Sequence, residues 1–98
     1  MILHTVNKSP AQPTLHTCLR FIADNDALIL LEDGVFAATS GWRETLESII
    51  VSGNRVYAVK ADVDARGLSS RLTEGIQVVD YAGFVDLCIT CSSVKSWF

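Results

Sequence analysis

The sequence predicts a single α/β domain over residues 1–98, built in three layers, with helices on both faces of a mainly parallel sheet of four to five strands. The first observation is that short apolar segments alternate with segments of helical periodicity, which is the order typical of βαβ units. The second is Ala27–Leu31, a continuous apolar run of the kind that parallel sheets bury on both sides. The third is the length, because 98 residues leave no room for a second core.

The first strand is predicted over Met1–Val6, which is apolar with β-branched residues and ends at the loop-forming segment Asn7–Pro10. A helix is expected from about Pro13, because proline is favoured at a first helical position. The apolar face of this helix repeats at helical spacing and consists of Leu15, Cys18, Leu19 and Ile22. Asp24–Asp26 ends the helix, and the apolar run that follows is the expected central strand.

The middle of the chain predicts a second helix and a third strand. Glu32–Gly34 closes the central strand, and a helix is expected over about Trp42–Val51. Its apolar residues at helical spacing are Leu46, Ile49 and Ile50. Arg55–Val59 is the expected third strand.

The last third of the chain predicts two further strands. A short helix or turn over Lys60–Arg66 is stopped by the glycine that follows it. Ile76–Val79 is the expected fourth strand, and a helix over Asp80–Cys91 is capped by its own first residue. Val94–Phe98 is the expected fifth strand, at an edge of the sheet.

Two loops are the places where a site is expected, since sites in parallel sheets form at the carboxyl ends of the strands. These loops are Asn7–Pro13 and Glu32–Ala37. The second opens with Glu-Asp-Gly, which suits a metal site or a tight turn, and the turn is favoured because no further acids lie nearby in the sequence. Glycine-rich nucleotide-binding motifs and a serine-hydrolase motif are absent. His4 and His16 are too few to nominate a general base from spacing.

The composition predicts an obligate oligomer. The chain is 49% hydrophobic and 19% charged, with a mean hydropathy of +0.30, so a domain of this size is expected to leave apolar surface exposed. A large exposed apolar patch on a soluble protein usually marks a partner surface. The aromatic pair Trp97-Phe98 would dock into a neighbouring chain or cover the sheet edge of its own chain.

The sequence predicts a cytoplasmic protein without disulfides. No apolar run approaches the ~20 residues of a membrane span, and the residues after Met1 do not form an export signal. Three cysteines are an odd number, and their spacing is not that of a secreted disulfide framework.

The charge distribution argues against a nucleic-acid binder and marks one basic segment. The net charge is −3. Residues 1–23 hold Lys8 and Arg20 and no acid, which gives +2, and the other 75 residues hold six basic and eleven acidic side chains, which gives −5. Cys18 lies in the basic segment.

Two interpretations of Cys18 are open, a packed core residue and a reactive thiolate. Free cysteine is among the most buried residue types, and its spacing places it at the edge of the apolar face of the helix, which favours packing. The helix dipole and the nearby basic residues Lys8, His4 or His16 would instead favour a reactive thiolate.

Cys88 and Cys91 form a lone CxxC pattern, which serves as a redox pair or as half of a zinc site in other proteins. A thioredoxin-type pair opens a helix, whereas this pair closes one, and zinc would need two further ligands. Cys88 continues an apolar face with Tyr81, Phe84 and Val85, so core packing is the favoured prediction.

Several segments, in this order and at this spacing, resemble the DsrH/TusB family of small sulfur-relay subunits. The matching pieces extend from residue 3 to residue 97: Leu3-His4-Thr5-Val6-Asn7-Lys8-Ser9-Pro10, Cys18-Leu19, Glu32-Asp33-Gly34, Ala37-Ala38, Ala65-Arg66-Gly67, Val79-Asp80-Tyr81, Phe84-Val85 and Trp97.

The resemblance implies a flavodoxin-like, DsrEFH-like subunit that assembles with DsrE-like and DsrF-like chains into a heterohexamer with two copies of each. It further implies persulfide transfer to a DsrC/TusE-like acceptor without a metal or organic cofactor. On this reading the chain is a sulfurtransferase subunit that is active only within the hetero-oligomer, and membrane and nucleic-acid binding are not expected.

Cys18 is the catalytic candidate that the resemblance implies, with Lys8 as a second contributor. A cysteine at this position marks the DsrH branch, which favours sulfur oxidation over a TusBCD-type role in 2-thiouridine synthesis on transfer RNA. The main sulfur carrier of the family belongs to the DsrE-type subunit, so a purely structural role for this chain is a further alternative. An independent thiol oxidoreductase that uses Cys88 and Cys91 is the rival from another class.

Overall fold

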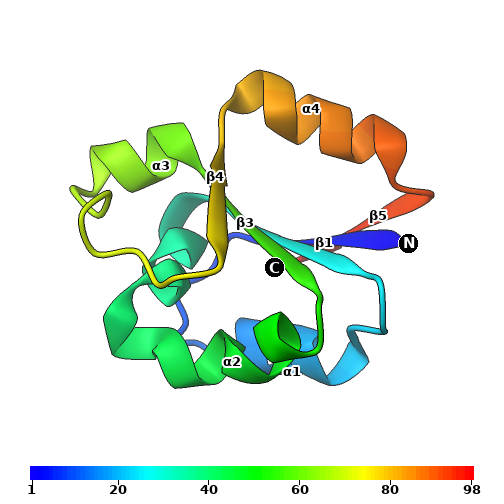
Figure 1. The fold of residues 1–98 in the computed structure, drawn as a ribbon, viewed down its shortest axis with the longest axis horizontal. Helices are drawn as coiled ribbons and strands as arrows, with labels where there is room; N and C mark the ends of the chain where they lie inside the picture. Colours follow the sequence, from blue (N-terminus) through cyan, green and yellow to red (C-terminus); the bar gives the residue numbers. More distant parts are fainter.

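A computed structural model describes all of residues 1–98 and contains one five-stranded sheet, in which every strand runs parallel to its neighbours (Figure 1). The strands are β1 (Ile2–Val6), β2 (Ala27–Leu30), β3 (Arg55–Val59), β4 (Ile76–Val79) and β5 (Ser93–Trp97). Their order across the sheet is β4-β3-β2-β1-β5. The predicted parallel sheet is confirmed, including its fifth strand at an edge.

Helices lie on both faces of this sheet, which confirms the three predicted layers. The α-helices are α1 (Thr14–Phe21), α2 (Arg43–Val51), α3 (Lys60–Ala65) and α4 (Tyr81–Thr90), and the 3-10 helices are η1 (Glu32–Ala38) and η2 (Ser40–Trp42). Figure 1 shows α1 and α2 on one face and α4 on the other. None of these helices combines the length and the apolar character that a membrane crossing requires.

The segment after β2 differs from the expected turn, because it continues as η1. Glu32 starts η1 with a positive φ of 50°, and Gly34 then lies directly against the end of β1. A Cβ atom at Gly34 would overlap the carbonyl oxygen of Val6, so only glycine fits at this position. Tight packing of this segment onto β1 therefore requires the glycine of Glu-Asp-Gly.

The connection from β4 to β5 reverses the direction in which the chain builds the sheet. From β1 to β4 each new strand is added on one side, and α4 then returns the chain to β5 on the other side of β1. In the parallel register, Val6 is paired with Trp97, so the carboxyl ends of β1 and β5 lie side by side. This is the topological switch point, where α/β proteins usually place their sites.

The core is divided by the sheet into two unequal clusters. Fourteen buried residues, among them Leu15, Cys18 and Leu46, pack on the side of α1 and α2. Only six, among them Leu3 and Cys91, pack on the side of α4. All four residues of β2 are buried, and they contribute to both clusters because alternate side chains point to opposite faces of the sheet.

The helix α4 is capped as expected but leaves much of its apolar surface exposed. The Asp80 carboxylate accepts a 2.8 Å hydrogen bond from the amide of Gly83. No residue of α4 is fully buried, and Tyr81, Val85 and Ile89 form an exposed apolar stripe at a spacing of four residues. Such a stripe is the kind of surface that a partner covers.

Candidate functional site

Cys18 lies on the face of α1 that points toward the sheet, and its side chain has no exposed surface. Burial raises the pKa of its thiol from 9.0 to about 12, the Lys95 ammonium acts in the opposite direction, and the Asp26 carboxylate adds to the rise. The thiol is therefore protonated at neutral pH in this conformation. This arrangement agrees with the interpretation of Cys18 as a packed core residue. A thiolate at this position would need the side chain to become less buried.

The cation that acts on Cys18 comes from β5 and not from the basic N-terminal segment. Lys95 is paired in register with His4, so its side chain lies on the α1 face of the sheet. Neither Lys8 nor His16 contributes to the pKa shift of the Cys18 thiol, and His16 is exposed. The pairing of β1 with β5 brings this lysine to α1 from 77 positions further along the chain.

The end of β5 closes the side of the core between α1 and the sheet edge. Trp97 packs against the core cluster that contains Cys18 and stacks on Phe21 of α1, with ring centroids 5.8 Å apart. The Lys95 ammonium lies 4.5 Å from the centroid of the Trp97 ring and 5.7 Å from that of Phe21. Aromatic stacking and cation–π attraction thus hold β5 against α1.

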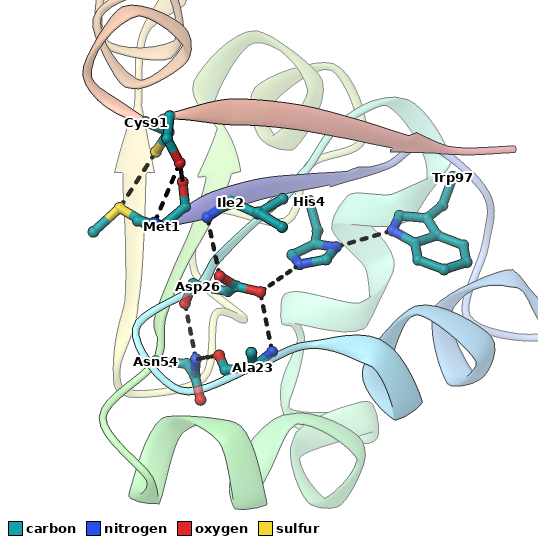
Figure 2. Close-up of polar contacts among 9 residues, drawn as sticks. Met1, Ile2, His4, Ala23, Asp26, Asn54, Cys91 and Trp97 are labelled. Atoms are coloured by element: carbon teal, nitrogen blue, oxygen red, sulfur yellow. Dashed lines mark hydrogen bonds and ion pairs between the residues drawn. The ribbon is translucent and has the colours of Figure 1, made fainter.

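Trp97 is also the outer member of a hydrogen-bonded chain that runs into the protein (Figure 2). Its indole Nε1–H donates to His4 Nδ1 over 3.1 Å, and His4 Nε2 lies 2.9 Å from Asp26 Oδ2. Indole is only a donor, so Nδ1 of His4 is the acceptor and Nε2 carries the proton that is donated to Asp26. The geometry therefore selects the neutral Nε2–H tautomer of a histidine that is almost completely buried.

Asp26 is the inner end of this chain and is also buried. Burial by itself would raise the pKa of its carboxyl, but hydrogen bonds from His4 and from the amides of Ile2 and Ala23 hold that pKa below its usual value of 3.8. The Asn54 side-chain amide donates to the carbonyl oxygens of Ala23 and Asp26 and fixes the same turn (Figure 2). A fully bonded carboxylate anchors the start of β1 to the turn before β2.

The predicted loop after β1 contains one buried polar atom without a partner. No hydrogen-bond donor reaches Asn7 Oδ1. Asn7 directly follows β1 and lies at the switch point, next to the end of β5. Buried acceptors are normally satisfied, so this atom marks a position where a ligand or a rearrangement would supply a donor. The loop after β2 contains no such atom, and its Asp33 is already paired with Arg66 at 3.0 Å.

The other predicted residues lie apart from Cys18. Cys88 and Cys91 belong to the α4 side of the sheet, where Cys91 is buried and Cys88 is half-buried against the smaller core cluster. All three cysteines are free thiols. Of the aromatic pair at the end of the chain, Trp97 covers its own sheet edge, while the Phe98 side chain is 80% exposed.

Sequence reasoning missed the polar chain of His4, Asp26 and Trp97. The available signal was a histidine inside an otherwise apolar strand, because a buried polar side chain needs a partner. The identity of that partner depends on the pairing of β1 with β2 and β5, which no local pattern contains.

Comparison with known proteins gives a consistent result. A family model described as DsrH like protein matches residues 8–94. Protein TusB of Escherichia coli O1:K1 / APEC is 41% identical over 96 residues, which is 98% of this chain and all of that protein. Protein TusB of Pectobacterium parmentieri is 33% identical over the same shares.

Solved structures show the same fold. The crystal structure of the ychN protein from E. coli has a TM-score of 0.84 and 20% sequence identity, and the match covers 97% of each chain. The solution structure of protein Tm0979 from Thermotoga maritima has a TM-score of 0.66 and 27% identity, and the match covers 91% of this chain and 92% of that one. These likenesses agree with the α/β sheet described above.

Proposed function

This chain belongs to the DsrH family, whose curated relatives include the TusB proteins, and from this membership we propose that it is one subunit of a cytoplasmic sulfur relay complex. The observation that supports this proposal most directly is the match to TusB proteins over 98% of the chain. A DsrE-like and a DsrF-like chain are the proposed partners, two copies of each subunit form the heterohexamer, and a DsrC/TusE-like protein is the proposed acceptor.

The surface of the chain supports a role inside an assembly. The stripe of Tyr81, Val85 and Ile89 offers apolar area that the fold itself does not cover. Two further apolar side chains, Phe98 after β5 and Val51 at the end of α2, are each 80% exposed elsewhere on the surface. Burial of such side chains by partner subunits would remove them from water, at a gain of about 25 cal/mol per Å² of apolar area.

The chemistry proposed for the relay is persulfide exchange. A cysteine thiolate attacks the outer sulfur of a donor persulfide, the S–S bond of the donor breaks, the donor leaves as a thiolate, and the attacking cysteine holds the new persulfide. Cys18 is the candidate of this chain for that step, with Lys95 as the nearby cation. Since Cys18 is enclosed in the free chain, the cysteine of the DsrE-type partner is the main carrier in this proposal.

The first candidate for the cellular role is a TusBCD-type contribution to 2-thiouridine in transfer RNA, because the named relatives are TusB proteins. Sulfur oxidation in a DsrEFH-type complex is the second candidate, and the presence of Cys18 favours it. Complementation of a tusB-deleted bacterium separates the two, since only the first role restores 2-thiouridine. Transfer of sulfur to a DsrC-type acceptor in the same cells without such restoration would favour the second.

Co-expression with the two partner chains tests membership in the complex. We expect one hetero-oligomer in light scattering, and a monomer that ignores both partners would contradict the proposal. The complex is then loaded with a persulfide donor, and the mass of each subunit is measured. A 32 Da gain on this chain that is lost in Cys18→Ser, but retained in the control Cys88→Ser, would assign sulfur transfer to Cys18. A complex in which only the DsrE-type subunit gains mass would give this chain a supporting role.

A further inference from the structure

His4 is a buried histidine, and both nitrogens of its ring are in hydrogen bonds (Figure 2). Nε2 carries the ring proton and donates it to Asp26, while Nδ1 accepts the indole N–H of Trp97. A neutral imidazole can take up a further proton only at the nitrogen that lacks one, which here is Nδ1. That nitrogen cannot hold a proton and accept the indole hydrogen at the same time. Protonation of His4 therefore breaks its hydrogen bond with Trp97.

The Asp26 carboxylate favours protonation of His4 in spite of the burial of the ring. It lies 2.9 Å from Nε2, and none of the lysines or arginines of the chain forms an ion pair with it. An imidazolium at His4 would therefore be the counter-ion of a buried carboxylate, which stabilises the charged form of the ring. Hydrogen bonds hold the pKa of the Asp26 carboxyl below 3.8, so it keeps its charge between pH 5 and pH 8, the range in which histidine ordinarily changes its charge.

Lys95 is the nearby charge that opposes an imidazolium at this position. It lies on β5, in register with His4 and on the same face of the sheet, and it carries the same sign of charge. Cys18, on the sheet side of α1, stays a neutral thiol between pH 5 and pH 8, because burial raises its pKa to about 12. The remaining titratable or charged groups of α1, His16 and Arg20, are exposed to water.

Trp97 holds the end of β5 on α1, so the loss of its hydrogen bond weakens that contact. Its ring packs on the core cluster that contains Cys18, stacks on Phe21 and attracts the Lys95 ammonium. After protonation, two N–H donors face each other where the bond had been. The imidazolium also repels Lys95 across the strand pair. Both effects act to move the end of β5 away from the sheet.

We propose that His4 is a pH-sensitive switch: the neutral ring holds Trp97 against α1, and the protonated ring releases it. This inference is independent of the proposed relay function, because it involves no partner chain and no sulfur transfer. Acidification would therefore loosen the cover of the larger core cluster at β5, while the Asp26 carboxylate keeps the imidazolium in place.

NMR of the full chain between pH 8 and pH 5 tests the switch without any substitution. The chain has two tryptophans, so Trp97 and Trp42 give two indole N–H resonances. We expect the Trp97 resonance to shift with the same midpoint as the ring nitrogens of His4, and the Trp42 resonance to stay in place. Trp97→Phe keeps an aromatic ring but removes the N–H donor that stabilises neutral His4. At a fixed pH, this variant should raise the ratio of protonated to neutral His4 by about 2- to 10-fold.

Release of the ring is measured by acrylamide quenching of fluorescence in a Trp42→Phe background, where Trp97 is the single tryptophan. Quenching should increase on acidification with the midpoint of the His4 resonances. His4→Gln is the matched control, because glutamine does not titrate and the pH dependence should be lost. His16 and the amino group of Met1 stay in this control, so any pH dependence that remains belongs to them.

Two results would overturn the switch. One is a His4 ring that becomes protonated while the indole N–H resonance of Trp97 stays in place. The other is a His4 ring that stays neutral throughout the pH range in which the chain is folded. If His4→Gln fails to fold, the NMR titration still decides, because it uses the unsubstituted chain.

Discussion

Replacement of Trp97 by alanine should turn Cys18 from an inert thiol into a reactive one. Trp97 packs on the core cluster that contains Cys18 and stacks on Phe21, so its removal opens the cover between α1 and β5. The Lys95 ammonium stays nearby and favours the thiolate once water can reach the sulfur. The background for this test is Cys88→Ser with Cys91→Ser, which leaves Cys18 as the single thiol.

The size of the effect follows from the raised pKa of the Cys18 thiol, which is about 12 in place of 9.0. At pH 8 these two pKa values correspond to thiolate fractions of about 10⁻⁴ and about 10⁻¹. The Cys18 thiol should therefore react with iodoacetamide about 1000-fold more slowly than a free thiol, before any steric protection is counted. Trp97→Ala should raise the rate of Cys18 alkylation by between about 10-fold and about 1000-fold over the protein with Trp97.

Alkylation at pH 8 is followed by the intact mass of the protein, and the free energy of unfolding of each variant is measured in urea. Trp42→Ala is the matched control, because it removes a half-buried tryptophan from η2 instead of β5. A control variant that is equally destabilised but keeps the slow rate would show that local opening at β5, rather than global unfolding, exposes Cys18.

Two results would refute this reasoning. One is alkylation of Cys18 at the rate of a free thiol in the otherwise unchanged fold, and the other is a Trp97→Ala rate within about twofold of the starting protein. Alkaline stability gives an independent check. Between pH 9.0 and about 12 the folded state keeps the proton on Cys18 and the unfolded state has lost it. The free energy of unfolding should therefore fall by about 1.4 kcal/mol per pH unit, a slope that Cys18→Ala removes.

Three further predictions concern the fold around the site. His4→Ala should lower the free energy of unfolding by about 3 kcal/mol in urea, because it removes a hydrogen-bond partner from the buried Asp26 carboxylate and from the partly buried indole N–H of Trp97. His16→Ala, at an exposed position, should change the free energy of unfolding by less than about 0.5 kcal/mol. The pKa of Asp26 is lowered in the folded state, so its contribution to stability is complete above the unfolded pKa near 3.8 and is lost as the pH falls through the folded pKa, and Asp26→Asn should flatten the acid limb of the stability–pH curve. Gly34→Ala should cost more than about 2 kcal/mol in thermal or urea unfolding, because its Cβ would overlap a carbonyl oxygen of β1, while Gly41→Ala, with open space around it, should cost far less, and equal costs would contradict the packing of η1.

The sequence predicts the fold well because its signals are local. The apolar run before Glu32 shows a strand buried on both faces, and the spacing of Leu15, Cys18 and Leu19 shows a helix with one apolar side. The strands are those predicted to within one or two residues at each end. The 3-10 helix η1 was not predicted, since it depends on the close approach of Gly34 to β1, a contact that only the folded chain makes.

The site was predicted less completely because its residues come from distant parts of the chain. Cys18 was recognised as a packed residue or a thiolate, and its burial follows from the apolar face of α1. The cation next to it, Lys95, could not be inferred, because it reaches α1 only through the pairing of β1 with β5. The same pairing brings Trp97 next to His4. The hydrogen-bonded chain from Trp97 through His4 to Asp26 therefore could not be predicted from local sequence patterns either.

The path of α4 has a mechanical consequence. The helix leaves β4 at one margin of the sheet and delivers the chain to β5 at the other, so it spans three intervening strands. Its 10 residues extend about 15 Å, close to the ~19 Å that separates the outermost strands, and the connection has little slack. Detachment of α4 would free β4 and β5 at the same time. The amides of these two edge strands should therefore exchange with deuterium as one unit, although the strands are not neighbours in the sheet.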